Sequence, residues 1–275
     1  MYTEIARKYL RLDKFPSIWC PGCGHGIILA SILRTIHKLE LDRNKVVMVS
    51  GIGCSGRTPG YVDFNTLHTT HGRALSFATG IKLANPELTV IVVMGDGDAA
   101  AIGGNHFIHA CRRNIDLTAI IYNNNIYGMT GGQVSPTTPF GAYATTAPYG
   151  QFETPFDIAR LALGAGATYV ARGTSYHVPM LDNLIKKGIQ HKGLSVIDVL
   201  TTCPINFGRR NKLSSDGAKN LKYIESISVP RSKFEKMNDD ERKGKYPIGI
   251  FREDDSMPEL TAVYRKKLEE IRREG

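Results

Sequence analysis

The chain has 275 residues, of which 42% are apolar and 22% are charged, as in an ordinary globular protein. No apolar segment reaches the ~18 to 20 residues that a transmembrane helix needs, and the first residues lack the apolar core of a signal peptide. We therefore expect a cytoplasmic protein with no membrane partner, whose five cysteines stay reduced. The net charge of +9 permits acidic partners, but no motif of a nucleic-acid-binding fold is present, so we expect no nucleic acid.

Short apolar runs rich in β-branched residues alternate with helical stretches as far as residue 200. The apolar runs predict strands at 45–50, 88–94, 117–123, 167–172 and 194–200. The stretches between and around them predict helices at 26–39, 72–83, 99–113, 155–163 and 176–191. Because the predicted strands are apolar on both faces, they favour a parallel sheet with helices on both sides. The predicted fold class is α/β, with a parallel sheet covered by helices and right-handed crossovers.

The segment after residue 206 has a different composition. It is rich in Lys, Arg, Asp and Glu and holds few β-rich runs. We interpret residues 1–206 as one domain and residues 207–275 as an extended basic C-terminal arm. The last part of this arm, near 258–273, predicts a charged helix.

Polar or sulfur-bearing residues follow most of the predicted strands. Cys54 follows the first strand, Asp96 the second, Asn124 the third and Cys203 the last. Ligands of open α/β sheets bind beyond the carboxyl ends of the strands. We therefore expect these side chains to meet at one edge of the sheet, which becomes the candidate site.

The stretch GDGD, residues 95–98, combines with Asn124 to indicate a metal–diphosphate site. Asp96 and Asn124 would place two hard oxygen ligands side by side, which suits Mg²⁺. Gly95 and Gly97 would let backbone N–H groups approach a diphosphate at the start of the next helix, where the helix dipole favours anions. Either motif alone would be interpreted as an ordinary turn. One crossover apart, and both directly after apolar strands, they favour the metal–diphosphate site.

Two residues separate Cys20 from Cys23 in the stretch WCPGCGHG, residues 19–26. This spacing suits half of a zinc site, a thiol–disulfide switch, or two of the four ligands of an iron–sulfur cluster. A zinc ribbon needs a second close Cys pair, which the sequence lacks, and a redox switch leaves Cys54 and Cys203 without a role. Cys111 lies inside a predicted helix, and we interpret it as a core residue.

The order of these motifs resembles one enzyme family. The Asp of GDG is followed 28 residues later by an Asn, as in thiamine-diphosphate-binding proteins. Together with WCPGCGHG, GIGCSGR, THGRA and NNNIYGMTGGQ, the pattern resembles the beta subunit of 2-oxoacid:ferredoxin oxidoreductases over residues 19–207. It is most similar to the two-subunit enzymes that act on 2-oxoglutarate. The resemblance implies the diphosphate-binding domain of thiamine enzymes.

The implied activity is the CoA-dependent oxidative decarboxylation of a 2-oxoacid, with electrons passed through one [4Fe–4S] cluster to ferredoxin. For 2-oxoglutarate, the products would be succinyl-CoA and CO₂, in a reversible reaction. Some relatives carry a lysine in the loop after Tyr-Gly, and this loop has none, so pyruvate or a broad range of 2-oxoacids stays open as substrate. Two hypotheses of other classes are a non-redox thiamine-dependent lyase with structural zinc and an electron carrier without thiamine diphosphate.

The resemblance assigns roles to individual residues. The cluster would be held by Cys20, Cys23, Cys54 and Cys203. Mg²⁺ would be bound by Asp96, Asn124 and the backbone carbonyl of Ile126. The aminopyrimidine or thiazolium end of the cofactor would be lined by Ile52, Gly53, Cys54 and Ser55. The diphosphate and its surroundings would be lined by Gly97, Asp98, Gly128 and Met129.

Several polar residues near these motifs have two interpretations. His71 matches a family histidine close to the cofactor and is our candidate catalytic residue, although a structural hydrogen bond at a helix start explains it equally well. We interpret His25 as structural. Gln133, Ser135 and Thr137 could face a substrate or a partner. Tyrosines near the site, among them Tyr122 and Tyr127, are interpreted as packing residues.

The chain has room for only one thiamine-diphosphate-binding domain. Thiamine enzymes take an activating glutamate from a pyrimidine-binding domain, so we expect an alpha subunit to supply it, in an αβ heterodimer or a dimer of heterodimers. The other expected partners are ferredoxin, a 2-oxoacid and coenzyme A. A basic stretch of the arm consists of Arg209, Arg210, Lys212, Lys219 and Lys222. This basic stretch could dock acidic ferredoxin, but packing of the arm on another subunit is the favoured interpretation.

Overall fold

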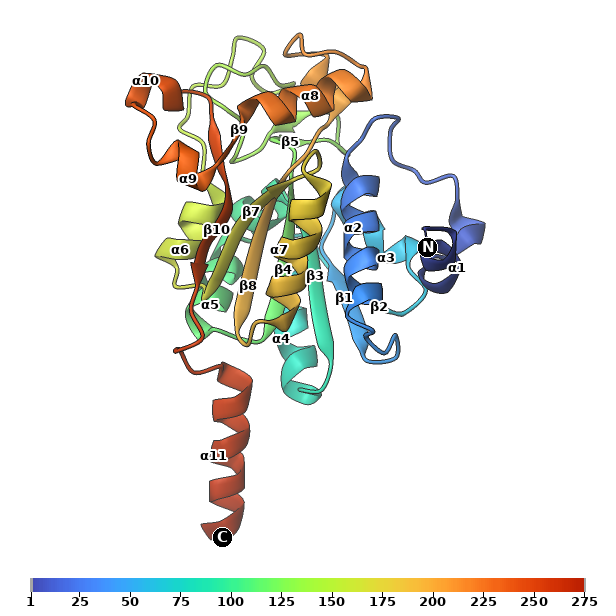
Figure 1. The fold of residues 1–275 in the computed structure, drawn as a ribbon, viewed down its shortest axis with the longest axis vertical. Coiled ribbons are helices and arrows are strands. Elements are labelled where there is room, and N and C mark those ends of the chain that lie inside the picture. Colours follow the sequence, from blue (N-terminus) through green and yellow to red (C-terminus); the bar gives the residue numbers. More distant parts are fainter. Residues whose placement is uncertain (1, 275) are drawn as a thin grey trace.

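The computed structural model describes residues 2–274, and an eight-stranded sheet forms its centre (Figure 1). The strand order is β2-β1-β3-β4-β8-β7-β10-β9, and all neighbouring strands are parallel except β7 and β10. The strands are β1 (Val46–Ser50), β2 (Asn65–His68), β3 (Thr89–Gly95), β4 (Leu117–Asn123), β7 (Tyr169–Thr174), β8 (Leu194–Leu200), β9 (Ser228–Pro230) and β10 (Tyr246–Glu253). A separate two-stranded hairpin consists of β5 (Ile126–Tyr127) and β6 (Gln133–Val134).

Helices cover both faces of the sheet. One face packs against α4 (Ala74–Ala84), α5 (Gly104–Arg113) and α6 (Ile158–Gly164). The other face packs against α1 (Tyr2–Tyr9), α2 (His25–Lys38), α3 (Thr58–Tyr61) and α7 (Val178–Gln190). The remaining helices are α8 (Gly217–Ile227), α9 (Arg231–Phe234), α10 (Asp239–Arg242) and α11 (Leu260–Glu274).

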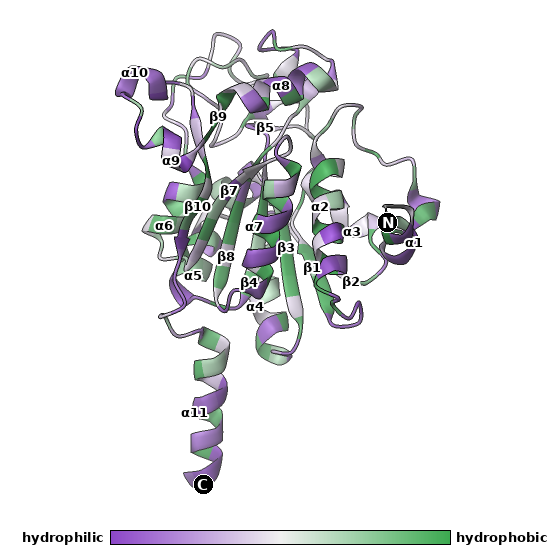
Figure 2. Ribbon diagram, viewed as in Figure 1, coloured by the Kyte–Doolittle hydropathy of each residue, from purple (hydrophilic) through white to green (hydrophobic). Residues whose placement is uncertain are grey.

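The hydrophobic core is divided by the sheet into two layers. Alternate residues of one strand point to opposite layers, so Val47 of β1 packs with Leu75 of α4, whereas Met48 packs with Ile32 of α2. All five residues of β1 are buried, as are all seven of β4 and of β8. Figure 2 shows this concentration of hydrophobic residues along the central strands. Burial on both faces explains why these strands are mostly apolar in sequence, without strict polar–apolar alternation.

The α/β fold with a parallel sheet is confirmed, and all five predicted strands are present. The predicted helices are also present, with their ends displaced by a few residues. The helix predicted at 99–113 is interrupted, because a π-helical turn, Asp98–Ile102, precedes α5. The break falls at Gly103, where an added Cβ would lie 2.3 Å from the backbone oxygen of Asp98.

The C-terminal segment differs from the sequence-based expectation. We predicted no strand after residue 200, yet β10 pairs antiparallel with β7 and β9 extends the sheet beyond it. Pro247 and Gly249 interrupt the apolar pattern of β10 and hide it from periodicity analysis. The charged helix near the C-terminus is confirmed as α11, which projects away from the body (Figure 1). The domain boundary between residues 206 and 207 stays a prediction.

None of the helices in residues 2–274 is both long and apolar enough to span a membrane.

Candidate active site

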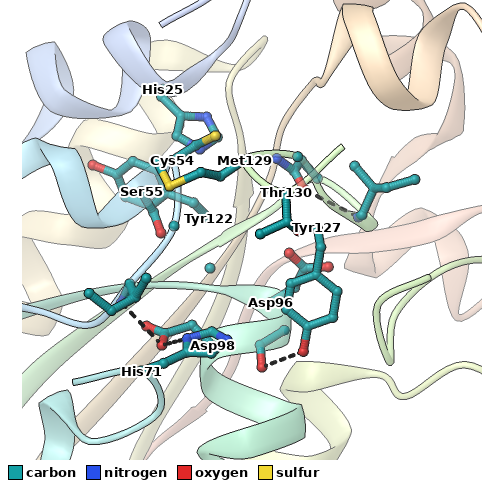
Figure 3. A pocket seen from close by; sticks show the side chains of 17 residues that line it. His25, Cys54, Ser55, His71, Asp96, Asp98, Tyr122, Tyr127, Met129 and Thr130 are labelled. Atoms are coloured by element: carbon teal, nitrogen blue, oxygen red, sulfur yellow. Dashed lines mark hydrogen bonds and ion pairs between the residues drawn. The ribbon is translucent and has the colours of Figure 1, made fainter. Parts of the chain in front are cut away.

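A cavity of about 120 Å³ lies at the carboxyl ends of β1, β3 and β4 (Figure 3). All residues that the sequence assigned to Mg²⁺ or to thiamine diphosphate are among those that line it. The full lining is His25, Ile52, Gly53, Cys54, Ser55, His71, Gly95, Asp96, Gly97, Asp98, Tyr122, Asn124, Ile126, Tyr127, Gly128, Met129 and Thr130. Figure 3 shows His71 and Asp98 at one end of the cavity and His25 and Cys54 at the other.

Asp96, directly after β3, is buried and held by two hydroxyl groups. The hydroxyls of Ser135 and Thr137 both donate to Oδ2 of Asp96, each at 2.5 Å. Burial raises the pKa of this carboxyl from 3.8 to about 6, although both hydrogen bonds act to lower it. The expectation that Ser135 and Thr137 face a substrate or partner was wrong, because both are buried and orient Asp96.

Asn124 and Ile126 lie beside Asp96 because β3 and β4 are parallel neighbours, with Gly95 opposite Tyr122. The Oδ1 atom of Asn124 accepts a hydrogen bond from the backbone N–H of Ile126 at 3.2 Å, which closes the turn after β4. A carboxylate, a carboxamide oxygen and a peptide carbonyl therefore border one cavity. This donor set fits Mg²⁺, which prefers hard oxygen ligands.

Asp98 and His71 lie on the opposite wall of the cavity and are joined by a hydrogen bond. The Oδ1 atom of Asp98 accepts hydrogen bonds from Nδ1 of His71 at 2.6 Å and from the backbone N–H of Gly72 at 2.7 Å. Its Oδ2 is buried without a hydrogen-bond partner among residues 2–274, and burial raises the pKa of this carboxyl. Gly51 makes room for Asp98, since an added Cβ there would lie 2.0 Å from Oδ2. The bond at Nδ1 leaves Nε2 as the ring atom of His71 that could meet a ligand.

His25 lies between the cofactor cavity and the cysteines, a position that the sequence did not reveal. It is buried, its ring packs edge-on against Tyr122, and its Nδ1 lies 3.1 Å from Sγ of Cys23. Burial lowers the pKa of His25 to about 4, so the ring is neutral near pH 7. Tyr127, which we interpreted as a packing residue, also lines the cavity, and its hydroxyl donates to the backbone oxygen of Gly97 at 3.2 Å.

A second cavity of about 240 Å³ is bordered by the four cysteines assigned to the cluster: Cys20, Cys23, Cys54 and Cys203. It adjoins the first cavity, because both are lined by His25, Cys54, Asn124, Gly128 and Met129. Cys111 lies apart from them, fully buried in the core, as the sequence predicted.

The backbone at Gly128 passes close to two of these sulfur atoms. An added Cβ at this position would lie 3.5 Å from Sγ of Cys203 and 3.6 Å from Sγ of Cys54. Burial raises the pKa of Cys23 to about 12 and that of Cys54 to about 11, so both are thiols before any metal binds. Within residues 2–274, no three His, Cys, Asp or Glu side chains are placed to hold a single metal ion. Four thiols around one cavity are the donor set of a [4Fe–4S] cluster, whose binding would displace their protons.

Comparison with known proteins agrees with this geometry. The family model described as "Thiamine pyrophosphate enzyme, C-terminal TPP binding domain" matches residues 51–199, which include Asp96 and Asn124. The fold and the cavity thus define a thiamine-diphosphate-binding domain.

Longer matches identify a narrower family. The chain is 51% identical over 269 residues to the 2-oxoglutarate synthase subunit KorB of Methanocaldococcus jannaschii, covering 98% of this chain and 99% of that protein. It is 58% identical over 231 residues to the KorB subunit of Archaeoglobus fulgidus, covering 78% of this chain and 86% of that protein. The chain belongs to the beta subunits of the 2-oxoacid:ferredoxin oxidoreductases.

A solved structure supports the same assignment. It is the 2-oxoglutarate:ferredoxin oxidoreductase from Magnetococcus marinus with 2-oxoglutarate, coenzyme A and succinyl-CoA bound. The TM-score is 0.85 at 33% sequence identity, and the match covers 97% of this chain and 90% of that chain.

Proposed function

We propose that this chain is the beta subunit of a 2-oxoglutarate:ferredoxin oxidoreductase, which converts 2-oxoglutarate and coenzyme A to succinyl-CoA and CO₂. The observation that carries the proposal is the adjacency of two cavities, one with the oxygen ligands and one with the cysteines, which share Cys54. The names of the relatives supply the substrate, since the two archaeal proteins are 2-oxoglutarate synthase subunits.

In this proposal the residues of the chain bind and orient the cofactors. Asp96, Asn124 and the carbonyl of Ile126 would hold Mg²⁺, and the hydroxyls of Ser135 and Thr137 orient Asp96 for this role. When bound, thiamine diphosphate supplies an electron sink for the decarboxylation. The loop from Ile52 to Ser55 lines the cofactor cavity, and its Cys54 also lines the second cavity, so a bound cluster would lie beside a bound cofactor.

The cofactor pocket is completed by an alpha subunit that carries the pyrimidine-binding domain and the activating glutamate. Two features support this part of the proposal. The cavity of about 120 Å³ is small beside the ~300 to 1,000 Å³ of typical cofactor sites, so further walls are needed. No glutamate is among the described residues that line it. The assembly would be an αβ heterodimer or a dimer of heterodimers.

A loop that comes after the cavity-lining residues in the chain offers a surface for the alpha subunit. Residues 139–156 contain one charged residue, Glu153, yet expose Phe140, Tyr149 and Phe152 by 72%, 97% and 79%. Backbone hydrogen bonds hold the loop in shape, for example from Gly141 N–H to the oxygen of Gln151 at 2.6 Å. Exposed aromatic side chains on a segment with a single charged residue are typical of a permanent protein interface.

Ferredoxin would dock on the basic stretch after Cys203. Arg209, Arg210, Lys212 and Lys219 are exposed, and none of them forms an ion pair within residues 2–274. The stretch begins directly after the π-helical turn Pro204–Gly208, which itself follows the cysteine. An acidic electron carrier bound there would lie near the cluster.

The test is anaerobic purification of the chain with its co-expressed partner, followed by an assay of 2-oxoacid-dependent viologen reduction. The proposal predicts reduction that requires coenzyme A and has a higher kcat/KM for 2-oxoglutarate than for pyruvate. A higher kcat/KM for pyruvate would contradict the assignment of 2-oxoglutarate as substrate and favour pyruvate. Absence of viologen reduction with every 2-oxoacid would overturn the proposal.

A further inference from the structure

A buried ion pair lies outside both cavities and joins two neighbouring strands of the sheet. Arg172 of β7 and Asp198 of β8 occupy opposite positions on neighbouring strands, and both are almost fully buried. The guanidinium Nε of Arg172 donates to Oδ2 of Asp198 at 2.7 Å. Burying two charges costs desolvation energy, so such a pair is a poor way to add stability and calls for another explanation.

The C-terminal strand encloses the arginine. Arg172 donates to the backbone oxygen of Pro247 at 3.3 Å, and its guanidinium lies 5.7 Å from the ring centre of Tyr246 and 5.5 Å from that of Phe251. It also forms an ion pair with Asp157. These contacts from several elements leave the guanidinium one orientation, with Nε directed at Asp198.

Asp198, held by Arg172, in turn orients a side chain at the end of β4. The Nδ2 group of Asn123 donates to Oδ1 of Asp198 at 3.0 Å. This bond fixes which way the carboxamide of Asn123 faces, and its Oδ1 accepts a hydrogen bond from Nδ2 of Asn125 at 3.2 Å. The same oxygen lies 3.0 Å from the hydroxyl of Thr137. Asn123 therefore holds Asn125 by a hydrogen bond and contacts Thr137 at the far end of the loop that follows β4.

Both side-chain ligands assigned to Mg²⁺ depend on this loop. Asn124 lies between Asn123 and Asn125, whose Nδ2 also donates to the backbone oxygen of Thr137 at 2.8 Å. The Thr137 hydroxyl donates to Asp96. A continuous set of buried and partly buried polar contacts thus runs from Arg172 to the oxygen ligands.

We propose that Arg172 and Asp198 are positioning residues for the Mg²⁺–diphosphate site, acting through Asn123. The inference rests on the proposed function, because it takes Asp96 and Asn124 as the Mg²⁺ ligands. Groups that orient metal ligands typically change metal affinity by about 10- to 100-fold when they are replaced. The same scale is expected here, with the substrate KM unchanged at saturating Mg²⁺.

The test uses the complete complex, stripped of Mg²⁺ and thiamine diphosphate, with calorimetric titration of Mg²⁺ in the presence of thiamine diphosphate. Asp198→Asn should weaken Mg²⁺ binding at least about tenfold. Arg172→Lys, which keeps the charge, should restore most of the affinity lost in Arg172→Met. Asn123→Ser leaves the ion pair intact and should weaken Mg²⁺ binding as Asp198→Asn does, so the proposal stays testable if the ion-pair variants fail to fold.

Arg34 and Asp182 provide a matched control. They form a buried ion pair between α2 and α7, with Nε to Oδ2 at 2.9 Å and Nη2 to Oδ1 at 2.8 Å, and neither residue lines the cofactor cavity. Asp182→Asn should lower Tm but leave Mg²⁺ affinity unchanged. Unchanged Mg²⁺ affinity in both Asp198→Asn and Asn123→Ser would overturn the inference. Failure of the wild-type complex to bind Mg²⁺ and thiamine diphosphate would instead contradict the proposed function.

Discussion

The indole Nε1 of Trp19 donates a hydrogen bond to the backbone oxygen of Cys54 at 2.8 Å. This contact joins the segment that carries Cys20 and Cys23 to the loop that lines the cofactor cavity. The same ring packs against Tyr61, with ring centres 4.9 Å apart. The bond therefore fixes the relative positions of three of the four thiols.

Replacing this tryptophan should make the cluster less stable. Trp19→Phe keeps an aromatic ring but removes a hydrogen bond, which typically contributes about 0.5–1.5 kcal/mol. We expect bleaching of the iron–sulfur absorbance in air to be several-fold faster, with thiamine diphosphate affinity unchanged. Tyr61→Phe is the control, because it removes only the bond from the backbone N–H of Ile18. Equal bleaching rates in the wild type and both variants would contradict the prediction.

The raised pKa of Asp96 predicts how Mg²⁺ stabilisation depends on pH. The pKa of Asp96 rises from 3.8 to about 6 on folding. Protonation of Asp96 therefore stabilises the metal-free fold fully below pH ~4, and this stabilisation is lost as the pH rises through about 6. Mg²⁺ needs the ionised carboxylate. The rise in Tm caused by Mg²⁺ and thiamine diphosphate should therefore be larger at about pH 7.5 than at about pH 5.5. In Asp96→Asn the Mg²⁺ effect should be small at both pH values, and an equally large wild-type effect at both would refute the account.

Charge reversal in the basic stretch should weaken the interaction with ferredoxin alone. Arg209→Glu combined with Lys212→Glu should raise the KM for ferredoxin several-fold at low ionic strength, and less at high salt, because exposed charges are screened. The rate with viologen should not change. Arg265→Glu combined with Lys266→Glu, on the projecting α11, is the control and should leave the KM unchanged. An unchanged KM for ferredoxin in the Arg209 and Lys212 variant would contradict ferredoxin docking and favour packing of the basic stretch on another subunit.

The exposed aromatic loop should control assembly. Tyr149→Ser combined with Phe152→Ser should weaken binding of the partner subunit more than tenfold, because central aromatic residues carry much of an interface's binding energy. The iron content of the chain should not change. Met257→Ser, at an apolar position outside the loop that is 51% exposed, is the control. Co-purification of the double variant with a full complement of partner would place the interface elsewhere.

Much of the fold could be predicted because the strands of the parallel sheet are buried on both faces. Strands such as β4 and β8 appear in the sequence as mostly apolar runs, interrupted by single polar residues such as Asp198. The edge strand β2 is four residues long and partly exposed, so it has no such pattern. The strand β10 contains Pro247 and Gly249, and only its pairing with β7 makes it part of the sheet.

The site was predictable where its residues follow strands in motifs, as Asp96 and Asn124 do. The residues that orient these ligands come from distant segments. Thr137 reaches Asp96 across 41 positions, and Asp198 reaches Asn123 across 75. Such contacts depend on strand register and loop path, which local sequence patterns do not encode.

We propose that four cysteines of this chain hold one iron–sulfur cluster beside the thiamine diphosphate site. The most direct test is to count iron, acid-labile sulfide and zinc per chain in the anaerobically purified complex, for the wild type, Cys203→Ser and Cys111→Ser. We predict about four irons and four sulfides in the wild type and in Cys111→Ser, and a marked loss of both in Cys203→Ser. Zinc without sulfide, or the same iron content in all three proteins, would contradict the ligand assignment.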